Sequence, residues 1–197
     1  MPGALTASPK TTAFWTALGA VLATDVVTKR AAEHALSPHV PYAVAGDAIR
    51  LTLTYNTGAA MNSSLGDFSR IGFSLIAVVM VVVLYRMYRA ASATDTWQAL
   101  ALGLVCGGAV GNLADRVRSA RGVVDFIDVG TADWRFWTFN VADAGVTAGA
   151  ALLAVILFRR DRAHGASAPS DVEPTGPTAP VGATPPVRAT PPDNRPT

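Results

Sequence analysis

Cysteine is almost absent from the sequence: only Cys106 is present, inside an apolar run. A disulfide framework and a CxxC metal motif are therefore excluded. Three scattered histidines, His34, His39 and His164, form no HExxH motif, so a metal site is not expected. Charged residues make up only 15% of the chain and the net charge is +2. This balance argues against a partner that is a nucleic acid.

Apolar residues, by contrast, are abundant. Half of the 197 residues are hydrophobic and the mean hydropathy is +0.32, a balance typical of a membrane protein. Four windows are apolar and long enough to cross a bilayer, at about 12–28, 69–88, 97–115 and 141–158. The first is interpreted as a retained helix, because Asp25 stands where a signal peptide would need a small residue for cleavage.

The two ends of the chain differ from this membrane domain, which is predicted to cover residues 13–158. Residues 1–12 are expected to form a flexible N-terminus. Nine of the thirteen prolines fall in 161–197 among Ala, Thr, Ser and Gly. Because such a composition cannot bury a core, residues 159–197 are predicted to be a disordered tail.

Two connecting segments carry strand patterns. Apolar and polar residues alternate along 49–56, which predicts a half-buried strand between the first two spans. Between the last two spans, VVDFIDV (123–129) and WRFWTF (134–139) predict two more strands around the turn-like GTAD. The predicted fold class is therefore an α-helical polytopic membrane protein with four transmembrane helices and a small β-structure.

The connectivity of four antiparallel spans brings polar residues together. The end of the first span, the start of the second, the end of the third and the start of the fourth share one membrane face. Asp25, Asn56, Asp115 and Asp143 all fall there, with both strand-bearing loops. The other face receives the short loop 86–96 and both termini, and the positive-inside rule places it in the cytoplasm.

The motif Asn-x-Ala-Asp occurs twice at that shared face, in GNLADR (111–116) and FNVADA (139–144). Asp143 follows Asn140 at the spacing of a capping box. Asp115 lies near a helix C-terminus, where the helix dipole disfavours an anion, and is therefore a functional candidate. Its neighbour Arg116 points elsewhere on the helix, so it is not expected to neutralise Asp115.

A stripe of glycines on the third span, Gly103, Gly107 and Gly111, lets another helix approach closely. If the fourth span packs there, Asp115 and Asp143 face each other. Two close carboxylates share a proton and can act as acid and base, which is aspartic peptidase chemistry. The hypothesis assigns the base to Asp143 and the proton to Asp115. The alternative is a proton-coupled transporter, whose site would lie nearer the midplane.

Five ordered blocks resemble a known family. They are DVVTK (25–29), YNTGAAMN (55–62), GGAVGNLADRV (107–117), GVVDFIDV (122–129) and FNVAD (139–143). Together they resemble the signature blocks of lipoprotein signal peptidase, also called signal peptidase II, over residues 13–158. The second block departs from the family pattern at Met61 and Asn62, which affects the expected substrate contacts of that loop.

The resemblance implies an intramembrane aspartic endopeptidase of the bacterial inner membrane, with four helices, an extracytoplasmic β-cradle and no metal or organic cofactor. Such enzymes remove signal peptides from prolipoproteins that carry a diacylglyceryl cysteine, cutting just before that cysteine. The implied partners are these substrates and membrane lipid. The protein is expected to act as a monomer, with cytoplasmic termini and an active site near the extracytoplasmic face.

The resemblance also implies roles for single residues. Its catalytic pair falls on Asp115 and Asp143. Supporting polar residues, which hold the substrate backbone and orient the pair, fall on Asn56, Asn112, Arg116 and Asn140.

Five other positions are assigned from local pattern. Asp25 and Lys29, spaced i,i+4, favour an interfacial ion pair over direct substrate contact. Gly58 favours a turn that needs a permissive backbone over close approach of substrate. Asp125 and Asp128 lie in a strand-like segment, where solvated or cradle-stabilising roles are favoured over catalysis.

Overall fold

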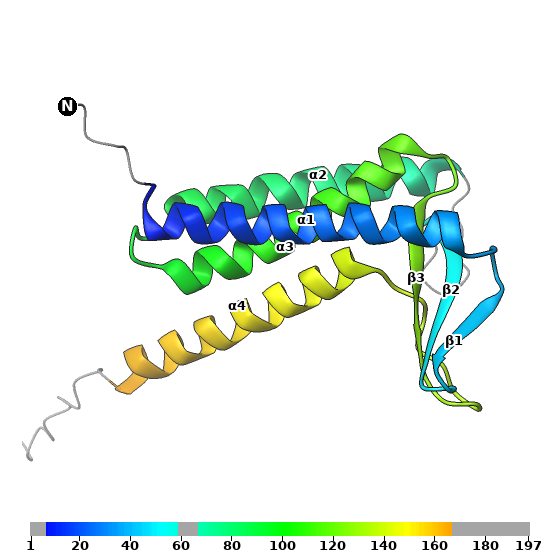
Figure 1. Cartoon of the computed structure of the whole chain (residues 1–197). Helices are drawn as coiled ribbons and strands as arrows, with labels where there is room; N and C mark the ends of the chain where they lie inside the picture. The colour runs from blue at the N-terminus through cyan, green and yellow to red at the C-terminus, as the bar shows by residue number, and fades with distance from the viewer. Residues whose placement is uncertain (1–6, 59–66, 167–197) are drawn as a thin grey trace, which may run out of the picture.

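Four long helices dominate the protein. The computed structural model describes residues 7–58 and 67–166. The helices are α1 (Pro9–Ala35), α2 (Asp67–Ala90), α3 (Thr96–Arg118) and α4 (Val141–Ala166). Each contains a segment long and apolar enough to cross a membrane, which confirms the four predicted spans. In Figure 1, α1, α2 and α3 run along one another. Helix α4 packs against α3 and remains in contact with it near its C-terminal end, where Arg160 donates to Gln98 Oε1 at 2.7 Å.

The first and last helices extend beyond the predicted spans. Helix α1 begins at Pro9, within the segment assigned to a flexible N-terminus. Ser8 explains this start, because its side chain accepts a hydrogen bond from the Thr11 N–H and Pro9 occupies the first helical turn. Helix α4 continues to Ala166, within the segment assigned to the tail. The rest of that tail lies outside the described residues.

A three-stranded antiparallel sheet stands at one end of the helices (Figure 1). Strands β2 (Ile49–Asn56) and β3 (Val123–Val129) form where the sequence predicts them, and they pair antiparallel. The third strand is instead β1 (Pro41–Ala45), whose residues are all exposed and show no alternation that would reveal it. Residues 134–139 form no strand; they fold back on β3 through isolated bridges.

The glycine stripe of α3 faces α1, not α4 as expected. A Cβ on Gly107 would lie 2.7 Å from the Leu18 carbonyl oxygen and 3.1 Å from the Val21 Cβ. Helix α4 packs against another face of α3. A Cβ added to Gly149 of α4 would lie 2.7 Å from the Ala101 carbonyl oxygen of α3. The stripe therefore holds α1 close to α3, which brings the polar residues of α1 into the site described below.

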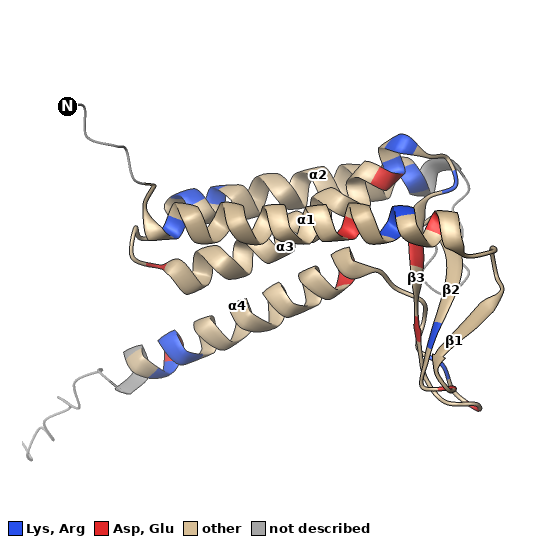
Figure 2. Ribbon diagram, in the orientation of Figure 1, with Lys and Arg blue, Asp and Glu red and all other residues tan. Residues whose placement is uncertain are grey.

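Charge and apolar surface are separated along the molecule. Figure 2 shows basic and acidic residues gathered toward the two ends of the helices, with most of the acidic ones toward the sheet. Toward the opposite end, Phe14 and Tyr88 stack with ring centroids 4.0 Å apart inside the core between α1, α2 and α3. The acidic residues near the sheet find their partners among the basic residues at the same end, as Asp115 does with Lys29 and Asp128 with Arg135.

Replacing Gly107 by Ala should destabilise the bundle. The added methyl overpacks the α1–α3 contact, which typically costs about 1–3 kcal/mol. The matched control is Gly19→Ala on α1, where a Cβ meets nothing within 4 Å, so the change should be neutral or slightly stabilising. Thermal unfolding of both variants in detergent checks this. Equal melting temperatures for the two variants would contradict the proposed close packing.

Candidate active site

The first turn of α4 holds Asp143 by a reciprocal pair of hydrogen bonds. The Asp143 N–H donates to Asn140 Oδ1 at 2.9 Å, and the Asn140 N–H donates to Asp143 Oδ2 at 3.2 Å. This is the predicted capping box. It fixes the carboxyl at the positive end of the α4 dipole, where a negative charge is stabilised.

Asn112 connects three helices through one side-chain amide. Its Nδ2 donates to Asp143 Oδ1 at 2.8 Å, which joins α3 to α4. Its Oδ1 accepts from Lys29 Nζ on α1 at 2.9 Å and from Asn140 Nδ2 at 3.1 Å. Asn140, which is fully buried, also donates from Nδ2 to the Val124 carbonyl oxygen at 3.2 Å.

Asp125 on β3 lies in the same network and is only 3% exposed. Asn140 Nδ2 donates to its Oδ1 at 2.6 Å, and Asn56 Nδ2 donates to its Oδ2 at 3.2 Å. Burial, followed by the nearby charge of Asp143, raises the pKa of Asp125 from 3.8 to about 7. The carboxyl is therefore protonated to a large extent near neutral pH.

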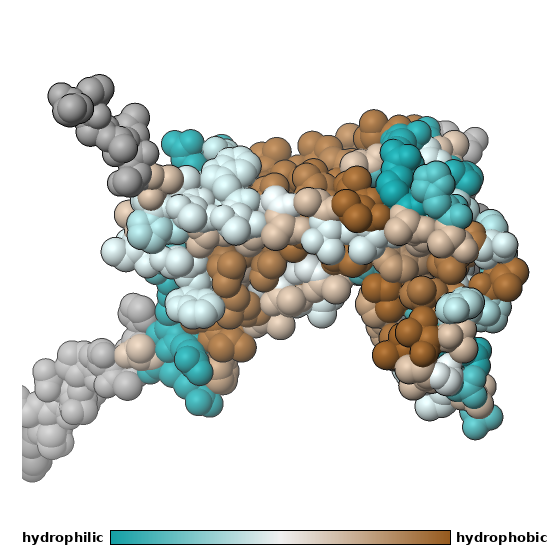
Figure 3. All heavy atoms as spheres, in the orientation of Figure 1, coloured by the Kyte–Doolittle hydropathy of each residue, from teal (hydrophilic) through white to brown (hydrophobic). Residues whose placement is uncertain are grey.

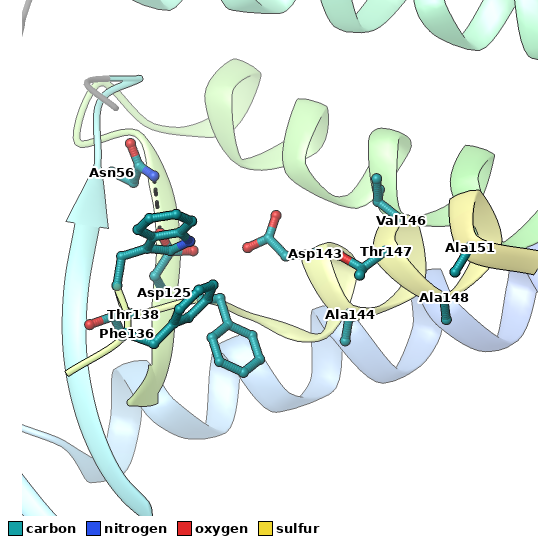
Figure 4. Close-up of a pocket in the computed structure, with 12 residues that line it drawn as sticks. Asn56, Asp125, Phe136, Thr138, Asp143, Ala144, Val146, Thr147, Ala148 and Ala151 are labelled. Atoms are coloured by element: carbon teal, nitrogen blue, oxygen red, sulfur yellow. Dashed lines mark hydrogen bonds between the residues drawn. The ribbon is translucent and has the colours of Figure 1, made fainter. Parts of the chain in front are cut away.

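A cavity of about 700 Å³ brings Asp125 and Asp143 together. Figure 4 shows the Asp143 carboxyl pointing from α4 toward Asp125 and Asn56. The rest of the lining is apolar or small, from the segment after β3 and from α4, and comprises Phe136, Trp137, Thr138, Phe139, Ala144, Val146, Thr147, Ala148 and Ala151. In Figure 3 the surface is hollowed between α4 and the sheet, beside apolar surface.

Asp115 has a different environment. Its Oδ2 lies 2.9 Å from Lys29 Nζ and accepts from the Val124 N–H at 3.2 Å, and its Oδ1 lies 3.4 Å from an Arg118 nitrogen. Lys29 also pairs with Asp25 at 2.7 Å, which confirms the predicted ion pair within α1. Asp115 is thus an ion-pair partner of Lys29 and is absent from the cavity lining, in which the described carboxylates are those of Asp125 and Asp143.

Comparison with known proteins identifies the family. Residues 17–159 match the family described as Signal peptidase (SPase) II. The chain belongs to this family. A lipoprotein signal peptidase of Pseudomonas syringae pv. tomato is 46% identical over 143 residues, which cover 71% of this chain and 82% of the relative. One from Rhodococcus jostii is 42% identical over 144 residues, covering 70% and 68%.

Solved structures agree with this assignment. A bacterial membrane enzyme determined by the in meso method at 2.3 Å resolution matches with a TM-score of 0.62 and 27% identity, covering 73% of this chain and 86% of that one. A second structure of a bacterial membrane enzyme, at 1.9 Å resolution, matches with the same TM-score and 28% identity. The protein is accordingly a multi-pass membrane protein of the signal peptidase II family.

The structure also shows the contacts of the other positions that the sequence analysis singled out in this signal peptidase II chain. Gly58 has a φ of +102° and a Cβ there would lie 2.8 Å from Phe73 Cε2, so the turn requires glycine. Arg116 donates from Nη1 to the Asn112 carbonyl oxygen at 3.1 Å and lies over the Phe73 ring. Asp128 pairs with Arg135 at 2.7 Å and stabilises the sheet, as expected. Met61 and Asn62 lie outside the described residues.

Sequence reasoning did not select Asp125. The signal that could have found it is local: VVDF places a carboxylate within a run of apolar residues, and all four are buried. A carboxylate buried in a strand needs hydrogen-bond donors nearby. The donors are amides of Asn56 and Asn140, both of which the sequence had already singled out. Within the part of the chain that the structure describes, no group of three or more His, Cys, Asp or Glu residues is arranged to hold a metal ion.

The raised pKa of Asp125 predicts how stability depends on pH. Between about pH 4 and pH 7 the folded chain binds more protons at this carboxyl than the unfolded chain does, so the free energy of unfolding falls as pH rises and then levels off. Asp125→Asn removes this titration. Relative to wild type, the variant should therefore gain stability from about pH 5 to about pH 8, by roughly 2–4 kcal/mol.

Melting temperatures of both proteins at the two pH values measure the effect. Asp133→Asn is the control, because that carboxylate is exposed on the same end of the molecule. A difference between Asp125→Asn and wild type that does not change with pH would contradict the assignment.

Proposed function

We propose that this chain is a bacterial aspartic endopeptidase that removes the signal peptides of prolipoproteins, and that Asp125 and Asp143 are its catalytic pair. Family membership supports the activity, since the relatives are lipoprotein signal peptidases. The observation that carries the assignment of the pair is the cavity lined by both carboxyls, one from β3 and one from α4. Asn140 contacts both and sets their relative position.

Asp143 acts as the base. Its two oxygens accept from Asn112 Nδ2 and from the Asn140 N–H, at the positive end of the α4 dipole. Each of these interactions favours a carboxylate. Asp143 takes a proton from a water molecule, and the water oxygen attacks the carbonyl carbon of the scissile peptide bond.

Asp125 acts as the acid. With a pKa of about 7, it carries the proton that the pair shares and donates it to the carbonyl oxygen as the tetrahedral intermediate forms. When the intermediate collapses, the C–N bond breaks, Asp143 passes its proton to the leaving nitrogen and Asp125 recovers the proton from the hydroxyl group. One water is consumed, and a carboxylic acid and an amine are released.

This proposal replaces Asp115 with Asp125 as the partner of Asp143. Lys29 lies 2.9 Å from the Asp115 carboxylate, and Arg118 is also close. A carboxylate held by two cations is a poor proton donor. Asp115 also lies outside the cavity lining, so it would have no access to a substrate bound there.

The substrate proposed is a prolipoprotein segment that carries a diacylglyceryl cysteine, cleaved just before that cysteine. The cavity supports this class because its polar end holds the two carboxyls while the wall along α4 is formed by small and apolar residues. The aromatic residues Phe136, Trp137 and Phe139 also line the cavity, from the segment after β3. A lipid-modified peptide can keep its acyl chains in the bilayer while its peptide bond reaches the carboxyls.

We further propose that the sheet end faces the extracytoplasmic side and that both termini are cytoplasmic. The opposite end carries Lys10, Arg86, Arg89, Arg159 and Arg160 around the short α2–α3 connection, which the positive-inside rule places in the cytoplasm. A monomer suffices for the activity, because a single chain supplies every described residue of the network. The transporter alternative is disfavoured, since Asp125 lies on β3 and Asp143 in the first turn of α4, rather than midway along a membrane helix.

The assignment of the pair is tested by near-isosteric variants. Asp125→Asn and Asp143→Asn should each lower kcat by about 10³-fold or more, because each removes an acid–base group. Asp115→Asn should lower thermal stability but keep a kcat at least about tenfold above those of the other two. The measurement is cleavage of a diacylglyceryl-modified lipobox peptide by purified protein in detergent, followed by mass. Full activity of Asp125→Asn, or a kcat for Asp115→Asn as low as that of Asp143→Asn, would refute the pair.

The pH–rate profile provides an independent check. Since Asp125 must be protonated to act as the acid, kcat for the same peptide should decline above about pH 7, as the carboxyl loses its proton. The decline should be absent from the residual activity of Asp125→Asn and retained by Asp133→Asn. A wild-type rate that rises steadily to pH 9 would exclude Asp125 as the acid.

A further inference from the structure

Lys29 is a buried cation that touches three oxygens near the active site. It is 2% exposed, and its Nζ lies 2.7 Å from Asp25 Oδ2, 2.9 Å from Asp115 Oδ2 and 2.9 Å from Asn112 Oδ1. Three acceptors match the three protons of an ammonium group. Lys29 is absent from the residues that line the cavity, so its effect on the reaction must pass through one of these partners.

We infer that Lys29 is a positioning residue for the peptidase reaction, because it holds the Asn112 amide in the orientation that donates to Asp143. This inference rests on the proposed function. Asn112 Oδ1 faces two donors, Lys29 Nζ and Asn140 Nδ2, which leaves Nδ2 to donate to Asp143 Oδ1 at 2.8 Å. A flipped amide would place its NH₂ against both donors and its oxygen against the carboxylate.

Because Lys29 is charged, its hydrogen bond to the Asn112 side-chain oxygen is stronger than one from a neutral donor would be. A hydrogen bond from a cation is shorter and about twice as strong as a neutral one. With the Asn112 oxygen bound to an ammonium, the flipped state is strongly disfavoured. Asp143 therefore meets a donor in a constant position when it accepts the proton from water.

The same lysine also has a structural role. Asp25, its partner on α1, accepts from the Ala142 N–H of α4 at 2.9 Å through its other oxygen. Lys29 thus links the first turn of α4 to α1, and it offsets the negative charges of Asp25 and Asp115. Loss of Lys29 would leave the buried Asp25 carboxylate without its cation and Asp115 with Arg118 alone, which is strongly destabilising. An experiment must therefore separate stability from positioning.

Two variants achieve this separation. Lys29→Met keeps the length of the side chain but removes the donor and the charge. The double variant Asp25→Asn/Lys29→Met removes one charge of each sign, so the net charge of the site equals that of wild type, and it keeps an oxygen for the Ala142 N–H. We expect the double variant to regain melting temperature relative to Lys29→Met, while kcat in both remains lower than wild type by about 10²-fold. KM should stay within roughly twofold, because Lys29 does not line the cavity.

A mutant cycle with Asn112→Ala tests the route of the effect. If Lys29 acts through Asn112, Lys29→Met lowers kcat in the wild-type background but not further in Asn112→Ala. Glu33→Gln is the control on α1, since it weakens ion pairs with Arg118 and Arg121 that include neither Lys29 nor Asn112. It should leave kcat unchanged.

Each outcome has a defined meaning. If the double variant recovers both the melting temperature and kcat, the inference is overturned and Lys29 has only a structural role. Additive losses of kcat for Lys29→Met and Asn112→Ala in the mutant cycle would overturn the inference as well. If Lys29→Met does not purify as a folded enzyme, the double variant carries the same comparison. A wild-type enzyme that does not cleave the lipobox peptide would refute the proposed function instead, so the two failures are distinguishable.

Discussion

The arrangement of the site depends on one constraint: charged groups buried beside a membrane domain must find partners within the protein. Lys29 meets this constraint by binding three oxygens, two of which are carboxylate oxygens. Through Asp25 and Asn112 the same lysine connects α1 with α3 and with the start of α4. The network is therefore structural and functional at once, because the contacts that make burial of charge tolerable also determine which way the amide beside Asp143 points.

Close helix packing is what makes this network possible. Gly107 and its stripe allow α1 to lie against α3 at a separation that a larger side chain would prevent. Lys29 reaches Asn112 and Asp115 only because the two helices approach in this way. The sheet then completes the site from the side, since β3 supplies Asp125 and β2 supplies Asn56, its hydrogen-bond donor. In the proposed mechanism, helices thus provide the base and its supports, whereas the sheet provides the acid.

Asp115, the partner of Asp143 that the sequence predicts, and Asp125, the partner proposed from the structure, differ by their surroundings rather than by their chemistry. Asp115 and Asp125 are both buried, at 6% and 3% exposed. Asp115 is compensated by two cations, while Asp125 is held by two neutral amides and faces another carboxyl. In the second setting burial outweighs the lowering of the pKa by the charge of Lys29, so the carboxyl keeps its proton to higher pH, as the proposed acid requires. This contrast is the physical basis for proposing Asp125 as the partner of Asp143.

The sequence by itself determined the four apolar helices, two of the three strands, the capping box of Asn140 and Asp143, and the ion pair of Asp25 and Lys29. These features are local, because they depend on hydropathy, alternation or spacing within one element. Family membership followed from ordered blocks of residues. Tertiary structure alone decided which face of α3 each helix covers, that exposed β1 joins the sheet, and that Asp125 rather than Asp115 shares the cavity with Asp143. Those outcomes depend on contacts between residues far apart in the chain, for which a single sequence carries no periodic signal.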